Sequence, residues 1–163
     1  MLVIFIFILQ SKNLSNVDAL SIENNPFYGL GNTKIYSVDS LTDDGTINIK
    51  LEYGPKTVQN GSPEFFKITL LNKDTNERVL HVDCDVVISK NNIEFFKASN
   101  DFSLPFVHTA NGVLLTSYNF QDSGDYVISV KIVGINFLPV NTKQVNFTTS
   151  ISTSEDKHVI NIT

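Results

Sequence analysis

The stretch that decides the fold is Gln121-Asp122-Ser123-Gly124-Asp125-Tyr126-Val127-Ile128-Ser129-Val130. Its first half consists of small and polar residues that favour turns, and Gly124 can adopt backbone angles that are costly for other residues. From Tyr126 onward the residues alternate as they do in a half-buried β-strand. The stretch therefore predicts a tight turn that leads directly into a strand.

Within this stretch, Asp122, Gly124 and Tyr126 form an Asp-x-Gly-x-Tyr pattern. Immunoglobulin-like sandwiches place this pattern before a central strand, and the Tyr hydroxyl bonds back to the turn backbone as a tyrosine corner. Disulfide-bearing members carry a Cys two residues after the Tyr, where this chain has Ile128, and the chain contains no Trp. We therefore predict a sandwich with an aliphatic core, in which the three corner residues stabilise the fold and bind no ligand.

Working outward from the corner, short runs with period-two alternation are separated by turn signals, and helical periodicity is absent. These runs predict strands at residues 34–39, 46–53, 64–71, 78–89, 93–98, 113–120, 126–133 and 144–151. The pattern predicts an all-β fold, a two-sheet antiparallel immunoglobulin-like sandwich of about seven to nine strands. A closed barrel is the alternative.

The composition agrees with one β domain. The chain has 163 residues, twelve of them Phe, and a net charge of −5 from 17 acidic and 12 basic residues. Roughly 100 to 200 residues is the usual length of one domain. Nucleic-acid binding is not expected, because it needs clustered cations and the Lys and Arg residues of this acidic chain are scattered. The single Cys rules out an intramolecular disulfide.

The N-terminal end of the chain predicts export. Residues 1–9 are uninterrupted apolar and 17–19 are Val-Asp-Ala, so residues 1–19 are expected to be a signal peptide. The run is too short for a membrane span, which takes ~20 apolar residues, but a buried N-terminal strand is an alternative. Residues 20–33 are then an extended N-terminal segment, 34–151 the sandwich, and 152–163 a flexible tail or a weak extra strand. No membrane anchor is expected after signal cleavage.

Three further segments carry a resemblance to a known group: HVDCDVVISKN at 81–91, FVHTANG at 106–112 and GINFLP at 134–139. Together with the corner, they resemble a group of exported β-sandwich proteins of ammonia-oxidising archaea, over about residues 33–151. The matching positions are His81, Val82, Asp83, Asp85, His108 and Thr109. Cys84 stands where the group has Tyr, and the C-terminal surface-sorting signal that many members carry is absent. The group has no established activity, so the resemblance implies fold and export only.

Alternation in the strand predicted at 78–89 separates two kinds of residue. One face receives an apolar row, namely Leu80, Val82, Cys84, Val86 and Ile88. The other face receives His81, Asp83, Asp85 and Val87. Cys84 is therefore predicted to be a buried thiol that acts as a small hydrophobe rather than a nucleophile.

The polar face of that strand offers a candidate metal site. His81 and Asp83 can converge on one cation, and His108, from the irregular stretch before residue 113, can supply a third ligand. Imidazole combined with carboxylate suits zinc or copper. The alternative is a solvated polar face whose acids lie opposite Lys or Arg on a neighbouring strand. A blue-copper site is not expected, because the only Met is Met1.

No motif for a phosphate loop, a zinc protease or a serine nucleophile occurs, so the chain is not expected to be an enzyme. The leading hypothesis is a non-catalytic exported module, extracellular, at the cell surface or pseudo-periplasmic, that binds or spaces a protein or a surface-layer component. It requires no cofactor. The alternative is a periplasmic copper- or zinc-binding protein that uses His81, Asp83 and His108.

Phe65-Phe66 and Phe95-Phe96 place adjacent rings on opposite sheet faces, so one ring of each pair is expected to be less buried and available to a partner.

Overall fold

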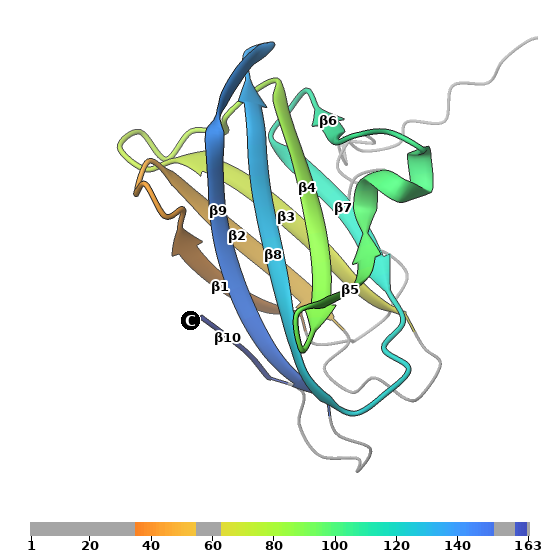
Figure 1. Cartoon of the computed structure of the whole chain (residues 1–163). Coiled ribbons are helices and arrows are strands. Elements are labelled where there is room, and N and C mark those ends of the chain that lie inside the picture. Colours follow the sequence, from red (N-terminus) through yellow and green to blue (C-terminus); the bar gives the residue numbers. More distant parts are fainter. Residues whose placement is uncertain (1–34, 55–62, 152–158, 163) are drawn as a thin grey trace, which may run out of the picture.

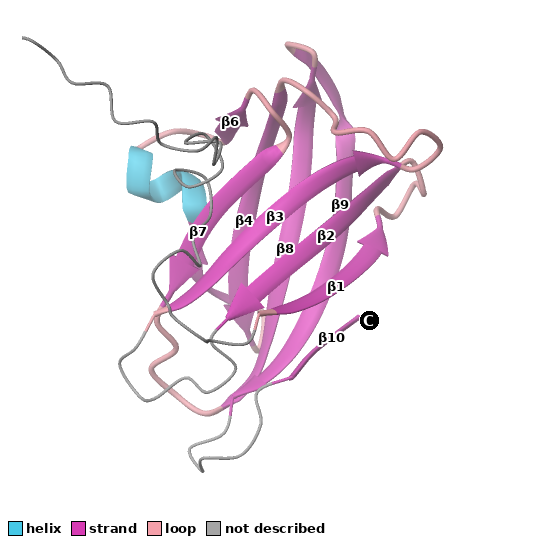
Figure 2. Ribbon diagram, turned by 180° about the vertical axis from the view of Figure 1, so that it is seen from behind, coloured by secondary structure: helices cyan, strands magenta, loops and turns pink. Residues whose placement is uncertain are grey.

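The computed structural model describes residues 35–54, 63–151 and 159–162, which form two antiparallel sheets packed face to face (Figures 1 and 2). The first sheet has the order β1-β2-β3-β7. Its strands are β1 (Tyr36–Leu41), β2 (Ile47–Gly54), β3 (Glu64–Asn72) and β7 (Val113–Tyr118).

The second sheet has the order β10-β9-β8-β4-β5. Strand β6 also pairs with β4, at residues 82–84, whereas β5 pairs with residues 87–90. Its strands are β4 (Val82–Lys90), β5 (Ile93–Lys97), β6 (Val107–Thr109), β8 (Gly124–Ile135), β9 (Leu138–Ile151) and β10 (Val159–Ile162). A short 3-10 helix, η1 (Ala98–Phe102), follows β5.

The connectivity is that of an immunoglobulin-like sandwich. β3 lies beside β7 in one sheet, while β4, β8 and β9 are neighbours in the other. These are the relations of strand B to E and of strands C, F and G in that fold. The predicted two-sheet sandwich is confirmed, and the closed barrel is wrong because the two sheets are separate.

The core lies between the sheets and comes from the alternating inward residues of both. The fully buried side chains include Ile49, Leu51, Phe66, Ile68, Leu70, Val86, Ile88, Ile128, Val130, Ile132 and Phe147. The prediction that Val82, Cys84, Val86 and Ile88 face the core is confirmed. The prediction for Leu80 is wrong: its side chain is 50% exposed, because β4 begins only at Val82.

The corner has the predicted geometry. Tyr126 is buried, and its hydroxyl donates a hydrogen bond to the carbonyl oxygen of Asp122 at 2.9 Å. Gly124 has φ +131°, which side-chain-bearing residues rarely adopt, and a Cβ there would lie 2.9 Å from Cε of Lys90. The turn therefore needs glycine for its backbone angles, whereas the flexible end of the Lys90 side chain can shift to admit a Cβ.

All eight predicted strands are present, with shifted ends, and the sequence patterns missed β6 and η1. β9 begins at Leu138, six residues before its predicted start, because β8 and β9 form one long hairpin. The predicted signal peptide, the segment 20–33 and residues 152–158 of the tail lie outside the described residues. Residues 159–162 form β10 along β9, which is the extra strand predicted as the alternative to a flexible tail. The described ranges contain no helix with the length and hydrophobicity to span a bilayer.

Candidate functional site

His81 lies just before β4, at one end of the sandwich. Its backbone has φ +49°, so it does not continue the alternation of the strand as predicted. Its N–H donates to the carbonyl oxygen of Ala110, and its own carbonyl accepts a hydrogen bond from the N–H of Asn136 at 2.8 Å. These bonds hold His81 between the β6–β7 connection and the turn of the β8–β9 hairpin.

Strand β6 brings His108 to the same place. His108 lies opposite Asp83 in the β4–β6 pairing, and its Nδ1 is 2.7 Å from Oδ1 of Asp83. The Asp83 carboxylate lies over Gly134 of β8, where a Cβ would come within 2.6 Å of Oδ2. Glycine at 134 therefore makes room for the carboxylate that fixes the His108 ring.

The turn between β8 and β9 adds a third ring. Asn136 and Phe137 are its two residues, with φ +51° and +63°, as in the turns that close tight hairpins. The Phe137 ring centroid is 4.5 Å from that of His81 and 5.5 Å from that of His108, and the two imidazole rings stack at 5.8 Å. A bulky residue at such an angle is strained, so the ring contacts offset a backbone cost.

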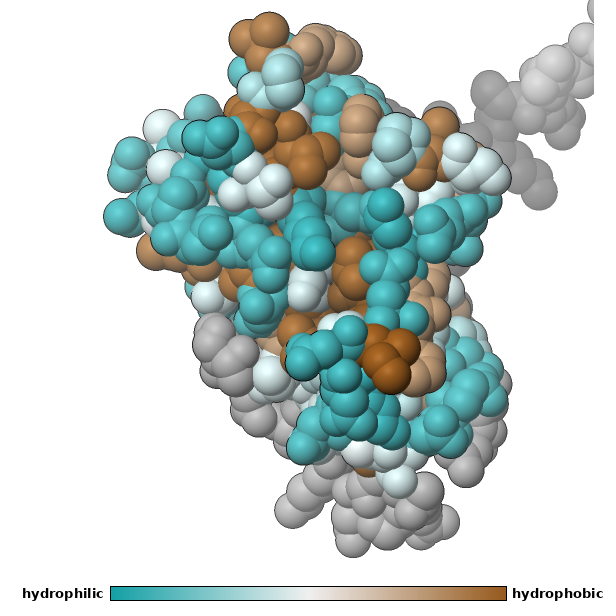
Figure 3. Space-filling view, in the orientation of Figure 1, coloured by the Kyte–Doolittle hydropathy of each residue, from teal (hydrophilic) through white to brown (hydrophobic). Residues whose placement is uncertain are grey.

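These rings belong to an exposed apolar area that we call the hairpin-end surface, defined by Leu80, His81, His108, Phe137 and Leu138. Phe137 and Leu138 are 70% and 67% exposed. Figure 3 shows the brown surface at the upper end of the molecule, where the β8–β9 hairpin of Figure 1 ends. Large apolar side chains gathered around polar rings are typical of surfaces that contact other molecules.

The structure brings the three predicted metal ligands together without arranging them around one point. His108 and Asp83 are bonded to each other, whereas His81 meets His108 through its ring face. Nδ1 of His81 is buried and has no hydrogen-bond partner among the described residues. Across residues 35–54, 63–151 and 159–162, no group of three or more His, Cys, Asp or Glu side chains is placed to hold a metal ion.

Asp85 lies on the same face of β4 as Asp83, as the alternation predicts, and it pairs with a Lys on a neighbouring strand, as the alternative predicts, but it is buried rather than solvated. It is buried, and its carboxylate accepts hydrogen bonds from the backbone N–H and the hydroxyl of Ser99 in η1. Lys97 of β5 pairs with it at 3.5 Å. Asp85 thus anchors η1 against β4, which is a structural use of the charge.

Cys84 is fully buried in the core, as predicted. Burial, together with the nearby carboxylates of Asp85 and Asp83, raises the pKa of its thiol to about 12. The thiolate that nucleophilic catalysis or metal binding needs is therefore disfavoured at this position.

No sequence pattern indicated Phe137, the residue that completes the hairpin-end surface. Asn-Gly is the usual signal of a two-residue hairpin turn, and Phe in place of Gly conceals it. The rings of Phe65 and Phe95 are less buried than those of their neighbours Phe66 and Phe96, as predicted, and Phe95 is 50% exposed.

Comparison with known proteins gives no match: no family model, curated protein or solved structure is similar to this chain.

Proposed function

We propose that this chain is a non-catalytic, exported binding module whose hairpin-end surface contacts a protein or a surface-layer component. The observation that carries the proposal is the exposure of Phe137 and Leu138 at the tip of the longest hairpin. Phe137 holds its ring there despite a backbone conformation that suits glycine. Strain retained at an exposed ring is characteristic of sites selected for contact.

Export supports this proposal but rests on the sequence of residues 1–19. An exported protein of this kind is located outside the cell, at the cell surface or in the pseudo-periplasm. Mass spectrometry of the protein recovered from its native cells tests it. A mature chain that begins after residue 19 is the expected result, and a chain that retains residues 1–19 contradicts cleavage.

The contact surface is tested by a pull-down from envelope extracts of those cells with the parent and a Phe137→Gly variant. Glycine suits φ +63° and leaves the turn intact, so the variant removes the ring and preserves the fold. Ile93→Ser is the matched control, because Ile93 is 62% exposed and follows the opposite end of β4. We expect a partner that the parent and Ile93→Ser retain and Phe137→Gly loses. Equal retention by all three proteins sinks the proposal.

A second candidate function is copper or zinc binding, which the proximity of His81 and His108 favours. Asp83 then orients His108 through Nδ1 and leaves Nε2 for the ion, as carboxylates do beside metal-bound histidines. Because the two rings stack in the structure, His81 has to rotate to present a nitrogen. The role of Asp83 changes from ligand to positioning residue.

Isothermal titration with Cu(II) and with Zn(II) tests this candidate. The parent is compared with a His81→Ala, His108→Ala double variant, and we expect heat of binding only from the parent. Equal heats from the two proteins mean that these histidines bind no metal.

A further inference from the structure

Strand β7 is the outer strand of its sheet, and the position beside it is open among the described residues. In an immunoglobulin-like sandwich the strand that β7 represents, strand E, is flanked by strand D. Here the chain between β5 and β7 forms η1 and β6, and β6 pairs with β4 in the other sheet. Among the described residues, no strand therefore takes the place of strand D at this edge.

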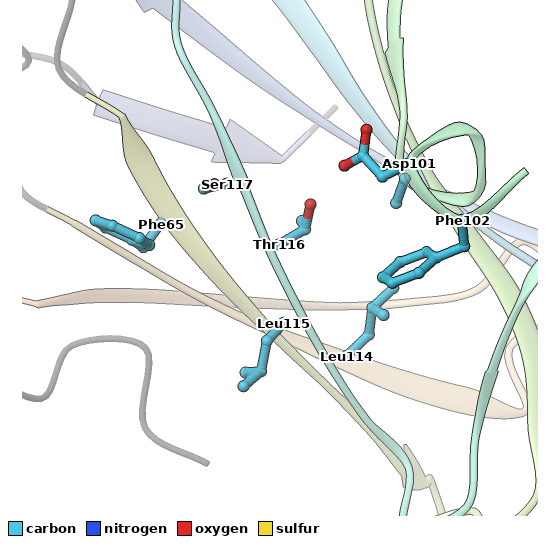
Figure 4. A pocket seen from close by; sticks show the side chains of 8 residues that line it. Phe65, Asp101, Phe102, Leu114, Leu115, Thr116 and Ser117 are labelled. Carbon is cyan, nitrogen blue, oxygen red and sulfur yellow. The ribbon is translucent and has the colours of Figure 1, made fainter. Parts of the chain in front are cut away.

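A mostly apolar pocket of about 240 Å³ lies at this free edge. Leu115 and Ser117 lie on one side of β7, Leu114 and Thr116 on the other, and the ring of Phe102 in η1 faces the latter (Figure 4). A pocket lined by both faces of an edge strand surrounds the place where the next strand of the sheet would run.

The β7 edge differs from the edges formed by β1 and β5. β1 carries Asp39, and β5 carries Glu94 and Lys97 beside a register shift in its pairing with β4. Charges and irregular pairing of this kind prevent strands from adding to a sheet edge. β7, with the sequence VLLTSY, has neither charge nor proline.

We propose that β7 pairs with β7 of a second copy of this chain, antiparallel and about a two-fold axis. The strand is complementary to itself: an axis through Leu115 places Leu115 opposite its own copy and Leu114 opposite Thr116. Every pair of strand residues is apolar or hydroxyl-bearing, so no like charges meet between the two strands, and the one charged side chain that lines the pocket is Asp101 of η1. The same surface serves both copies. The two four-stranded sheets become one continuous sheet of eight strands.

Two exposed side chains beside β7 extend this interface. A specific interface buries roughly 1,200–2,000 Å², which is more than one pair of strands provides. Phe102, which lines the pocket, is 63% exposed, and Leu104, two residues further along the chain, is 52% exposed. The proposal is independent of the proposed function, because the hairpin-end surface takes no part in it.

Sedimentation velocity from micromolar to millimolar protein tests the proposal. We expect the parent to form a concentration-dependent dimer and Ser117→Lys to raise its dissociation constant by about tenfold or more, because a lysine on an edge strand opposes the addition of another strand and would lie opposite Val113 of the second copy. Ser117 is exposed, so the variant leaves the core intact. Ser37→Lys is the control, since Ser37 is an exposed serine on β1, the other edge of the same sheet.

A cross-link supplies the second measurement. Leu115→Cys is treated with a short bis-maleimide, and Ser37→Cys is treated in parallel. Cys84 is fully buried and does not contribute. We expect a covalent dimer from Leu115→Cys alone. Either of two results overturns the proposal: a parent that stays monomeric at every concentration, or a Ser117→Lys variant that dimerises as tightly as Ser37→Lys. A protein in which another segment covers β7 would give one of these results.

Discussion

Tyr126 combines three kinds of interaction at one position. Its ring packs edge-on against Phe120 with centroids 4.9 Å apart, inside the core. Nζ of Lys90 lies 5.0 Å from the centre of the same ring and donates a hydrogen bond to the carbonyl oxygen of Ser123. The Tyr hydroxyl closes the turn at Asp122. The residue therefore links the core, the turn and the end of β4.

We predict that Tyr126→Phe lowers the free energy of unfolding by about 1 to 3 kcal/mol, because it deletes one partly buried hydrogen bond and keeps the ring. Urea denaturation measures the change. Tyr118→Phe is the control, since no hydrogen bond of the Tyr118 hydroxyl occurs among the described residues, and its effect stays within about 0.5 kcal/mol. Equal midpoints for Tyr126→Phe and the parent would contradict the assignment of the corner.

The corner could be predicted because all of its parts lie within five residues of sequence. The positions of His81 and Phe137 could not, since alternation assumes an extended backbone and both residues have positive φ. Those angles depend on the hydrogen bonds that join His81 to Ala110 and Asn136, and on a turn that Phe137 conceals. Contact between His81 and His108 was only one possibility from the sequence, because pairing of β6 with β4 decides it.

At the scale of elements, the β1–β2 turn fastens one sheet to the other. Asp43 and Gln144 of β9 exchange two hydrogen bonds, from the N–H of Asp43 to the Gln144 carbonyl and from the N–H of Gln144 to the Asp43 carboxylate. Asp44 accepts hydrogen bonds from the hydroxyls of Thr42 and Thr46 and pairs with Lys143. The turn of the first sheet is thus bound to a strand of the second.

This contact predicts a dependence of stability on pH. The hydrogen bond from Lys143 holds the pKa of Asp44 well below its ordinary value of 3.8, and the two threonines act in the same direction. Because the folded pKa is the lower one, ionised Asp44 stabilises the fold above about pH 4, and this contribution is lost as the pH falls through the folded pKa.

We therefore expect Asp44→Asn to destabilise the protein by about 0.5 to 1 kcal/mol at pH 7, a modest effect because the pair is partly solvated. Thermal unfolding at a series of pH values measures the difference from the parent, which narrows below about pH 4. Asp74→Asn, at an exposed turn, serves as the control. A difference that is constant with pH, or absent at pH 7, would show that Asp44 does not link the sheets.

Period-two alternation located the central strands, where one face is buried. It missed β6, which has three residues, too few for a period to be visible. It also placed the start of β9 too late, because residues 138–143 are mostly exposed and show no contrast between faces. Sequence patterns thus record burial, and strands held by pairing alone leave little trace.

At the scale of the whole molecule, Cys84 is a reporter of global unfolding. Its thiol lies in the core between the sheets, with a pKa raised to about 12. We predict that a thiol reagent labels Cys84 in the native protein only at the rate at which the whole domain opens, and immediately in denaturant. Labelling rates should therefore fall with every stabilising condition. Rapid labelling of the folded protein would mean that β4 opens locally.

The architecture also implies an order of events in time. β8 and β9 are joined by two residues, so their pairs close short stretches of chain, whereas β3 and β7 are separated by forty residues, from Lys73 to Gly112. Closing a longer stretch costs more chain entropy, and contacts between distant residues slow folding. The β8–β9 hairpin is therefore expected to form before β7 pairs with β3. During that interval β7, which carries no charge, is unpaired in every newly made chain. The strand is then most exposed to pairing with a different protein.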